Sequence, residues 1–219
     1  MDFAKAREFM VEQQVRPWDV LDSRVLKAMM RVPREEFVLP EQRNLAYADV
    51  DLPLGDGSFN RKPVFQGRVL QSILVQPDES VLEIGTGVGY QTACLAMLAG
   101  NVVTVEADAA RANTAATKLS SMGYNNVAVV NGDAMSPSVV GDEAFDVIVV
   151  NSAISEVPEN FLEALKPGGR MFFVRGDAPA MEAVVLTKSE SGSGYSTKAV
   201  FETDIPYLSG AAPASTFVL

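Results

Sequence analysis

The chain has 219 residues, of which 47% are hydrophobic and 21% charged, and this size suits one α/β domain with a modest appendage. Its formal net charge of −10 argues against nucleic acid as a partner, because phosphate contacts need clustered lysines and arginines. The lack of histidine excludes histidine-based catalysis, and with a single cysteine we expect no metal site. We also expect a cytoplasmic protein without membrane contact, since neither a signal peptide, a long apolar run nor a cysteine pair is evident.

The first 76 residues are predicted to be mainly helical. Apolar residues at helical spacing predict one helix over residues 2–14 and a second helix, which Asp22 or Ser23 caps and Pro33 ends. Residues 55–63 show no periodicity and are expected to form a loop, and helical spacing resumes over 64–75. We expect residues 1–76 to form a helical extension with a substrate loop, packed on a core of residues 77–219 within one structural domain.

From residue 80 onward, short apolar runs alternate with segments of helical spacing. Such alternation predicts a doubly wound, Rossmann-like α/β fold with a mostly parallel sheet. The last two strands flank a polar Ser/Gly-rich loop, so they are expected to form an antiparallel hairpin at the sheet edge. The predicted strands are 80–84, 101–106, 127–131, 145–150, 170–174, 182–188 and 198–203, and the predicted helices are 91–98, 108–122 and 158–165.

Three glycines alternate directly after the first of these strands, at Gly85, Gly87 and Gly89, in an E-x-G-x-G-x-G pattern that Glu83 opens. A dinucleotide-binding turn reads G-x-G-x-x-G and presents a helix N-terminus to a pyrophosphate; here the third glycine comes one residue early and Tyr90 follows. S-adenosylmethionine (SAM) has no phosphate, but it has an ammonium group that an acidic strand end can hold. We therefore expect a SAM site, in which glycines let the backbone approach the cofactor closely.

Polar residues at the strand ends are further candidates, because ligands of doubly wound sheets bind beyond the carboxyl ends of the strands. Glu106 closes the second strand 17 residues after Gly89, close to the spacing of a ribose-binding acid; a helix-capping role is the alternative. Asp133 suits the adenine amino group or a turn, and Asn151 and Ser152 either border the methyl donor or form a turn. The predicted cofactor-binding residues are Glu83, Gly85, Thr86, Gly87, Gly89, Tyr90, Glu106, Ala107, Gly132, Asp133, Ala134 and Asn151.

Longer motifs indicate which family of SAM-binding proteins the chain resembles. They are V-P-R-E-E-F-V at 32–38, A-Y at 46–47, L-P-L-G-D-G at 52–57, V-L-E-I-G-T-G-V-G-Y-Q at 81–91, G-D at 132–133, E-V-P at 156–158 and L-K-P-G-G-R at 165–170. With these motifs the chain resembles the protein-L-isoaspartate O-methyltransferases, a family of class I SAM-dependent methyltransferases, over most of its length. The glycine motif marks only the class, whereas the segments before it mark the family. The resemblance implies a seven-stranded class I methyltransferase sheet.

The resemblance also implies a reaction. The family transfers a methyl group from SAM to the α-carboxylate of isoaspartyl residues in damaged proteins or peptides and leaves S-adenosylhomocysteine (SAH). A carboxylate is already ionised at neutral pH, so no general base is needed, which agrees with a chain that lacks histidine. Alignment of acceptor, methyl carbon and leaving sulfur then does most of the work, and such positioning can supply roughly 7–11 kcal/mol. The oligomeric state stays open.

The substrate loop departs from the family pattern G-x-T-I-S-Q-P, in which the serine contacts the substrate carboxylate. The glycine and proline are retained as Gly57 and Pro63, at the same spacing. The residues between them are Ser58, Phe59, Asn60, Arg61 and Lys62. An ungapped match puts Phe59 at the threonine, Arg61 at the serine and Lys62 at the glutamine, so hydroxyl groups are replaced and two cations are added.

Three hypotheses follow from this change. Arg61 could bind the acceptor carboxylate in a charge-assisted pair, which would keep the isoaspartyl activity but slow the transfer. Alternatively, the SAM site could serve a different, anionic acceptor. Finally, the protein could bind SAM or a partner protein without catalysis, and Arg61 and Lys62 would then simply lie in solvent on a mobile loop.

Overall fold

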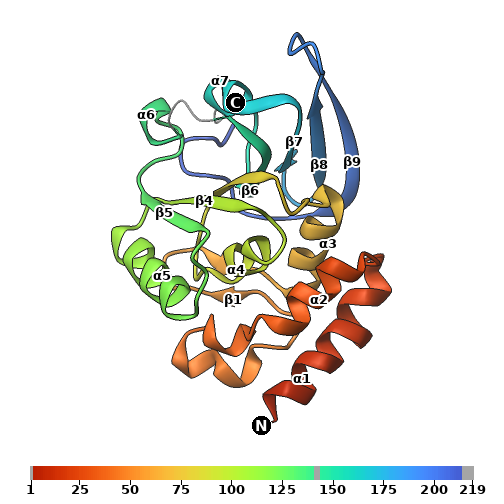
Figure 1. The fold of residues 1–219 in the computed structure, drawn as a ribbon, viewed down its shortest axis with the longest axis vertical. Helices are drawn as coiled ribbons and strands as arrows, with labels where there is room; N and C mark the ends of the chain where they lie inside the picture. The colour runs from red at the N-terminus through yellow and green to blue at the C-terminus, as the bar shows by residue number, and fades with distance from the viewer. Residues whose placement is uncertain (1, 141–143, 214–219) are drawn as a thin grey trace, which may run out of the picture.

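A seven-stranded mixed sheet forms the centre of the molecule in the computed structural model (Figure 1). The structure describes residues 2–140 and 144–213, so the outer ends of the two predicted segments, residue 1 and residues 214–219, lie outside the described residues. The strand order is β5-β4-β3-β6-β7-β8-β9. These strands are β3 (Ser80–Ile84), β4 (Asn101–Glu106), β5 (Val127–Asn131), β6 (Phe145–Ala153), β7 (Leu165–Arg175), β8 (Met181–Lys188) and β9 (Tyr195–Thr203).

Strands β3 to β7 run parallel, and β8 and β9 extend the sheet as an antiparallel hairpin at its edge. The prediction of a mostly parallel, doubly wound sheet with a C-terminal hairpin is therefore confirmed. Strand β3 lies between β4 and β6, so the strand order reverses beside it. The carboxyl end of β3 is thus a topological switch point, the place where open α/β sheets bind their ligands.

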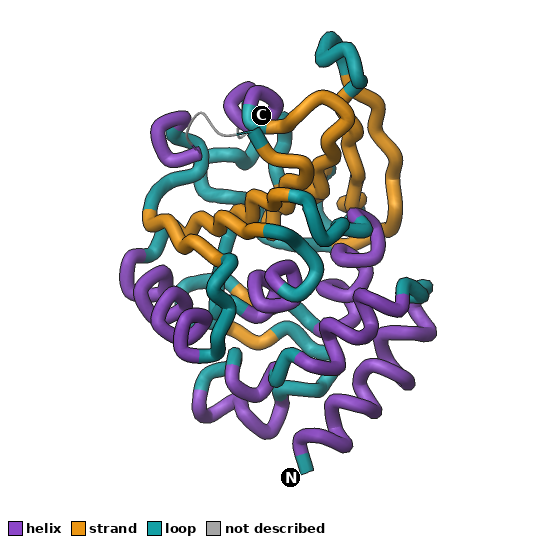
Figure 2. The backbone as a smooth tube through the Cα atoms, viewed as in Figure 1, coloured by secondary structure: helices purple, strands orange, loops and turns teal. Residues whose placement is uncertain are grey.

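Helices cover both faces of the sheet (Figure 2). One face carries α3, α4 and α5, with the N-terminal helices packed outside them, and the other face carries α6 and α7. The helices are α1 (Phe3–Phe9), α2 (Ser23–Arg31), α3 (Pro63–Ile73), α4 (Tyr90–Ala96), α5 (Ala109–Ser121), α6 (Pro137–Val140) and α7 (Glu159–Glu163). A π-helical segment (Met10–Val15) and 3₁₀ segments (Arg16–Trp18, Arg34–Glu36, Pro40–Leu45) complete the N-terminal region.

Close packing and one polar cluster hold the first helices against the rest of the N-terminal extension. A Cβ atom at Gly67 of α3 would lie only 2.6 Å from Val15 Cγ1, so the glycine allows the two helical segments to approach. Arg7 of α1 donates from Nη2 to Glu35 Oε1 at 2.9 Å and from Nε to Tyr47 Oη at 2.8 Å. The V-P-R-E-E-F-V and A-Y motifs therefore contribute structural contacts within the extension.

The region predicted as an irregular loop contains a small hairpin. Strands β1 (Leu52–Pro53) and β2 (Phe59–Asn60) pair antiparallel, with Leu52 opposite Asn60. Strands of two residues are too short to show any periodicity, so the sequence pattern could not reveal them. Strand β6 also runs on to Ala153, which places Asn151 inside the strand rather than in a turn after it.

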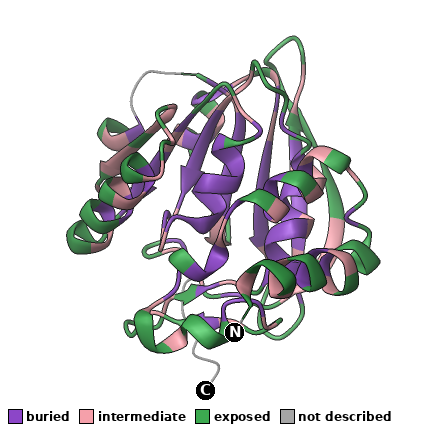
Figure 3. Cartoon of the chain, turned by 60° about the horizontal axis from the view of Figure 1, so that its bottom comes forward, coloured by how far each residue is buried: buried purple, intermediate pink, exposed green. Residues whose placement is uncertain are grey.

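The sheet and α4 form the buried centre, and the outer helices expose one side to solvent (Figure 3). Along β3 the side chains alternate between the two faces: Val81 packs in one apolar cluster, and Leu82 and Ile84 pack in the other. Glu83 is buried in the same strand. Within residues 2–140 and 144–213, no helix is long and apolar enough to cross a membrane.

Candidate functional site

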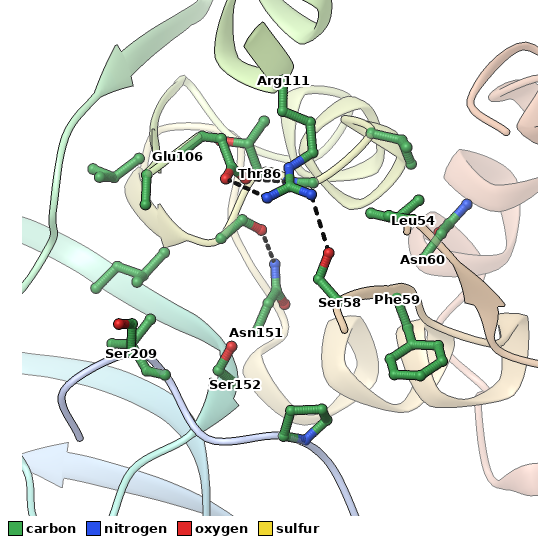
Figure 4. Close-up of a pocket in the computed structure, with 18 of the residues that line it drawn as sticks. Leu54, Ser58, Phe59, Asn60, Thr86, Glu106, Arg111, Asn151, Ser152 and Ser209 are labelled. Atoms are coloured by element: carbon green, nitrogen blue, oxygen red, sulfur yellow. Dashed lines mark hydrogen bonds and ion pairs between the residues drawn. The ribbon is translucent and has the colours of Figure 1, made fainter. Parts of the chain in front are cut away.

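A cavity of about 350 Å³ opens at the carboxyl ends of the parallel strands (Figure 4). The glycine turn after β3 and the ends of β4, β5 and β6 line one side of it. The rest of the wall comes from the segment 206–209 after β9 and from most of residues 54–62, which we call the acceptor loop. Because this is the switch point of the sheet, the cavity lies where a ligand is expected.

Most predicted site residues line this cavity. The predicted cofactor-binding residues in its wall are Gly85, Thr86, Gly87, Tyr90, Glu106, Ala107, Gly132, Asp133, Ala134 and Asn151. Those predicted in the substrate loop that also line it are Ser58, Phe59, Asn60 and Arg61. Glu83, Gly89 and Lys62 lie outside the wall.

The three glycines of the turn have backbone conformations that side chains rarely adopt. Their φ angles are +92° at Gly85, +55° at Gly87 and +88° at Gly89, so each position favours glycine. The acceptor loop lies over this turn, because Leu54 Cδ1 is 4.0 Å from the position of a Cβ atom on Gly87. The acceptor loop therefore packs against the glycine turn through Leu54.

Glu106 at the end of β4 presents a fixed carboxylate to the cavity. Its Oε2 accepts a hydrogen bond from the Gly87 amide at 2.9 Å, and its Oε1 accepts one from the Asp108 amide at 3.0 Å. Arg111 Nη2 donates to the same Oε1 at 3.2 Å. The alternative role, capping of the following helix, belongs to Asp108, whose side chain accepts from the Arg111 amide. A carboxylate oriented in this way can accept hydrogen bonds from a diol.

Glu83 lies behind the cavity wall, fully buried. Its carboxylate accepts hydrogen bonds from the hydroxyls of Thr92 and Thr104, and from Asn151 Nδ2 at 3.0 Å. Burial raises the pKa of Glu83 to about 7, against the hydrogen bonds, and the nearby charge of Glu106 adds to the rise. Glu83 holds Asn151 by this hydrogen bond, and Asn151 lines the cavity and also donates to the Gly85 carbonyl at 3.0 Å.

Asp133, at the end of β5, forms the predicted turn contact and also lines the cavity, and its contact with adenine stays a prediction. Its Oδ1 accepts a hydrogen bond from the Met135 amide at 2.9 Å, as a turn aspartate does. The residue is nevertheless exposed in the cavity wall beside Gly132 and Ala134. A Cβ atom on Gly132 would lie 2.7 Å from Val139 Cγ2, so the glycine lets α6 pack closely behind this wall.

Arg61 is held inside the structure. Its side chain is 12% exposed, its Nη1 lies 3.1 Å from Asp51 Oδ2, and its Nη2 donates to the Asp204 carbonyl at 3.2 Å. The guanidinium carbon also lies 5.3 Å from the centre of the Phe65 ring. The hypothesis that Arg61 simply lies in solvent is therefore wrong, whereas Lys62 is exposed. Burial lowers the pKa of Arg61, and the charge of Asp51 opposes that shift.

A second arginine, Arg34, supports the acceptor loop from below. It is fully buried and donates to the carbonyls of Ala46 at 2.8 Å and Arg61 at 2.6 Å, and to the side-chain oxygen of Gln66. Its guanidinium carbon lies 4.6 Å from the centre of the Tyr90 ring, at the start of α4. Arg34 therefore joins the acceptor loop to the helix that follows the glycine turn.

Several buried polar atoms in the wall have no hydrogen-bond partner among the described residues. They are Asn60 Oδ1, Arg61 Nε, Tyr90 Oη, Gln91 Nε2, Gln91 Oε1 and Arg111 Nε. Unpaired buried polar atoms are costly, so a cavity lined by them favours a polar ligand. Among the residues that the structure describes, no cluster of three or more acidic or cysteine side chains could hold a metal ion.

Sequence reasoning missed part of the cavity wall. Gln91 directly follows the glycine motif, so its place could have been inferred from the helix start. The place of Arg111 in the cavity wall could not be inferred, because an arginine in the first turn of a helix does not by itself indicate a site. The segment 206–209 could not be placed from sequence either: it reaches the cavity because Tyr207 lies beside Ala153 at the end of β6.

Comparisons with known proteins agree with this architecture. The family profile described as Protein-L-isoaspartate(D-aspartate) O-methyltransferase (PCMT) matches residues 5–203. A protein-L-isoaspartate O-methyltransferase of Koribacter versatilis is 38% identical over 196 residues, which are 90% of this chain and 87% of that protein. One of Petrotoga mobilis is 37% identical over 193 residues, or 88% of this chain and 91% of that protein.

Solved structures show the same fold. A crystal structure from Plasmodium falciparum, described as a putative protein-L-isoaspartate O-methyltransferase in complex with S-adenosyl-L-homocysteine, superposes with a TM-score of 0.79 at 16% identity, over 92% of this chain and 97% of that one. Another protein-L-isoaspartate O-methyltransferase gives a TM-score of 0.77 at 26% identity, over 92% of this chain and 65% of that one. With the family profile spanning nearly the whole sequence, the chain belongs to the protein-L-isoaspartate(D-aspartate) O-methyltransferase family.

Proposed function

We propose that the protein is a SAM-dependent methyltransferase whose acceptor is the α-carboxylate of isoaspartyl residues in peptides and proteins. The observation that carries this proposal is the carboxylate of Glu106, which the glycine turn and α5 orient at the wall of the cavity. Membership of the family supports the acceptor class. We place this activity in the cytoplasm, a proposal that rests on the lone, buried Cys94.

The residues of the cavity fit SAM. Glu106 would accept from the ribose hydroxyls, and Asp133 with Ala134 would border the adenine. The glycine turn, with Thr86, would approach the sugar and the amino-acid part. Asn151 and the unpaired amide of Gln91 offer both donors and acceptors to that polar part. We revise the role of Glu83: it would hold Asn151 and the turn in place from behind the wall.

When bound, SAM supplies an electrophilic methyl group. The chain then needs only to hold an ionised carboxylate in line, because this acceptor requires no general base. The acceptor loop provides the groups for that task. Arg61 lines the cavity, and its buried Nε has no partner among the described residues, so this guanidinium would donate to an acceptor carboxylate that reached it while Asp51 keeps it in place.

The arginine at the serine position also favours a second candidate. Because Asp51 pairs with Arg61, the guanidinium attracts a carboxylate less strongly, and the cavity would then take an acceptor other than an isoaspartyl group, or no acceptor at all. In these cases SAM would bind, but an isoaspartyl peptide would not be methylated. Cofactor binding and acceptor identity therefore need separate measurements.

A labelled-methyl assay tests the proposal. Wild type is incubated with labelled SAM and a peptide that contains isoaspartate, and with the same peptide containing ordinary aspartate as the control. We expect a base-labile methyl ester on the isoaspartyl peptide only, and competition by SAH. The loop variant Phe59→Thr/Arg61→Ser, which restores the family's hydroxyls, should label the same peptide faster. If both proteins bind SAH by calorimetry and neither labels the peptide, the isoaspartyl acceptor is wrong.

A further inference from the structure

Arg111 links the acceptor loop to the cofactor side of the cavity through ion pairs. It extends from the first turn of α5 between the loop and the end of β4 (Figure 4). Its Nη1 lies 2.8 Å from Asp56 Oδ2 and 3.1 Å from Ser58 Oγ, and its Nη2 lies 3.2 Å from Glu106 Oε1. One guanidinium therefore holds two loop residues and the predicted ribose-binding acid at fixed separation.

The two ion pairs of this bridge differ in burial. The Arg111 side chain is 22% exposed and the Glu106 side chain 7% exposed, so water screens their interaction only in part, whereas the Asp56 side chain is 49% exposed. Hydrogen bonds from Ser58 and Arg111 hold the pKa of the Asp56 carboxyl far below its usual range, so it stays ionised. Planar guanidinium groups suit such two-sided contacts, because their donors are fixed in direction.

The contacts of Arg111 lie close to the place where the acceptor loop packs on the glycine turn. The loop lies over Gly87 through Leu54, and the Gly87 amide donates to Glu106, the carboxylate that Arg111 also contacts. A shift of the loop would therefore move Arg111 relative to Glu106. The acceptor loop and the cofactor turn are thus linked through the Arg111 side chain as well as through packing of the Leu54 side chain.

We propose that Arg111 is a positioning residue that fixes the acceptor loop, through Asp56 and Ser58, against the cofactor-binding acid Glu106. The identities of the two sites it joins rest on the proposed function. Arg111 does not touch the reacting carboxylate; it sets the distance between the acceptor and the methyl donor. Loss of the bridge should therefore loosen the loop and weaken acceptor binding, with a smaller effect on turnover of bound acceptor.

The test is a double-mutant cycle of Arg111→Gln and Asp56→Asn, with Arg111→Lys as the conservative variant. Arg16→Gln is the matched control, since Arg16 also forms a helical ion pair, with Glu12, but on the surface and outside the cavity wall. The first readout is amide hydrogen exchange of residues 54–60, without acceptor and with or without SAH. We expect about threefold to tenfold faster exchange in Arg111→Gln, the same in Asp56→Asn, and no further rise in the double variant.

The second readout is the KM for the isoaspartyl peptide, expected to rise by about the same factor with kcat less affected, and with partial rescue by lysine. Unchanged loop exchange in Arg111→Gln, or additive effects of the two substitutions, would overturn the proposal. The exchange readout needs no acceptor. If loop exchange responds as expected but no isoaspartyl peptide is methylated, the proposed function fails and the role of Arg111 stands.

Discussion

Arg61 stands where the family pattern has a serine, and its surroundings suggest how it would affect the reaction. Asp51 and the Asp204 carbonyl hold two of its nitrogens, and the buried Nε has no partner among the described residues. Methyl transfer from a sulfonium to a carboxylate removes charge from both, so a cation beside the carboxylate stabilises the reactants more than the transition state. Such an interaction lowers KM and also lowers kcat.

Replacement of Arg61 by serine should therefore raise both constants. For Arg61→Ser we expect kcat for an isoaspartyl peptide to rise by roughly threefold to tenfold, with a comparable rise in KM, because a charge-assisted hydrogen bond is lost. Steady-state kinetics with labelled SAM measures both. A fall in kcat would show instead that the guanidinium stabilises the transition state.

Glu106 carries the proposed ribose contact. Glu106→Ala should weaken SAM binding by roughly 1–3 kcal/mol, because charge-assisted hydrogen bonds are lost and the amides of Gly87 and Asp108 lose their acceptor. Isothermal titration calorimetry measures the change. Glu182→Ala is the control, since that carboxylate pairs with Arg175 in β7, away from the cavity. Equal affinities for Glu106→Ala and wild type would refute the ribose role.

The buried carboxyl group of Glu83 should make the free energy of unfolding depend on pH. Its folded-state pKa is raised to about 7 from a reference value of 4.5, mainly by burial. The folded protein therefore binds more protons than the unfolded chain between these values, and the free energy of unfolding falls as pH rises through this window. From pH 5 to pH 8 the loss should be about 2–3 kcal/mol larger in wild type than in Glu83→Gln. Urea denaturation at the two pH values measures it, and equal losses would contradict a buried titrating Glu83.

At the scale of elements, the acceptor loop depends on the N-terminal region beneath it. Arg34 has three buried acceptors, of which two are backbone carbonyls on either side of the small hairpin, Ala46 and Arg61. No carboxylate among the described residues hydrogen-bonds to Arg34. Carbonyl oxygens and the Tyr90 ring therefore stabilise its positive charge. The V-P-R-E-E-F-V motif, to which Arg34 belongs, thus contributes to the shape of the acceptor loop.

Arg34→Met should destabilise the fold by about 2–4 kcal/mol, because buried acceptors are left without donors and methionine fills only part of the space. Arg43→Met is the control, because Arg43 pairs with Glu36 at the surface, where ion pairs contribute roughly 0–1 kcal/mol. Chemical denaturation of both variants gives the comparison. Similar small losses in the two would show that the Arg34 contacts add little to stability.

Elements with a clear period could be predicted from the sequence, and their positions in space could not. The run 80–84, its glycine turn and the strand 101–106 follow from alternation of apolar residues and from glycine spacing, and β3 and β4 have the same bounds. The two-residue strands β1 and β2 carry no period. Arg111 was missed for a similar reason, because its role depends on a loop that lies 53 residues from it in the chain, at Ser58.

At the scale of the whole molecule, distant parts of the chain converge on the switch point of the sheet. The acceptor loop precedes the cofactor-binding strands, and the segment 206–209 follows all of them, yet both line the same cavity. We therefore propose that residues 1–76 and 77–219 act as one structural unit. The sequence predicted the glycine turn and Glu106 at this cavity because strand ends of a parallel sheet meet at one edge. It could not predict that Glu83 would lie behind the wall, because only packing decides which side of a strand end faces a ligand.

The central claim is that this cavity binds SAM and that isoaspartate is the acceptor despite Arg61. It is tested most directly by the ratio of kcat/KM for an isoaspartyl peptide to kcat/KM for its aspartyl counterpart, measured on wild type with labelled SAM. We expect methyl ester on the isoaspartyl peptide and a ratio far above one. A ratio near one, or no ester although SAH binds in the cavity, would contradict the account.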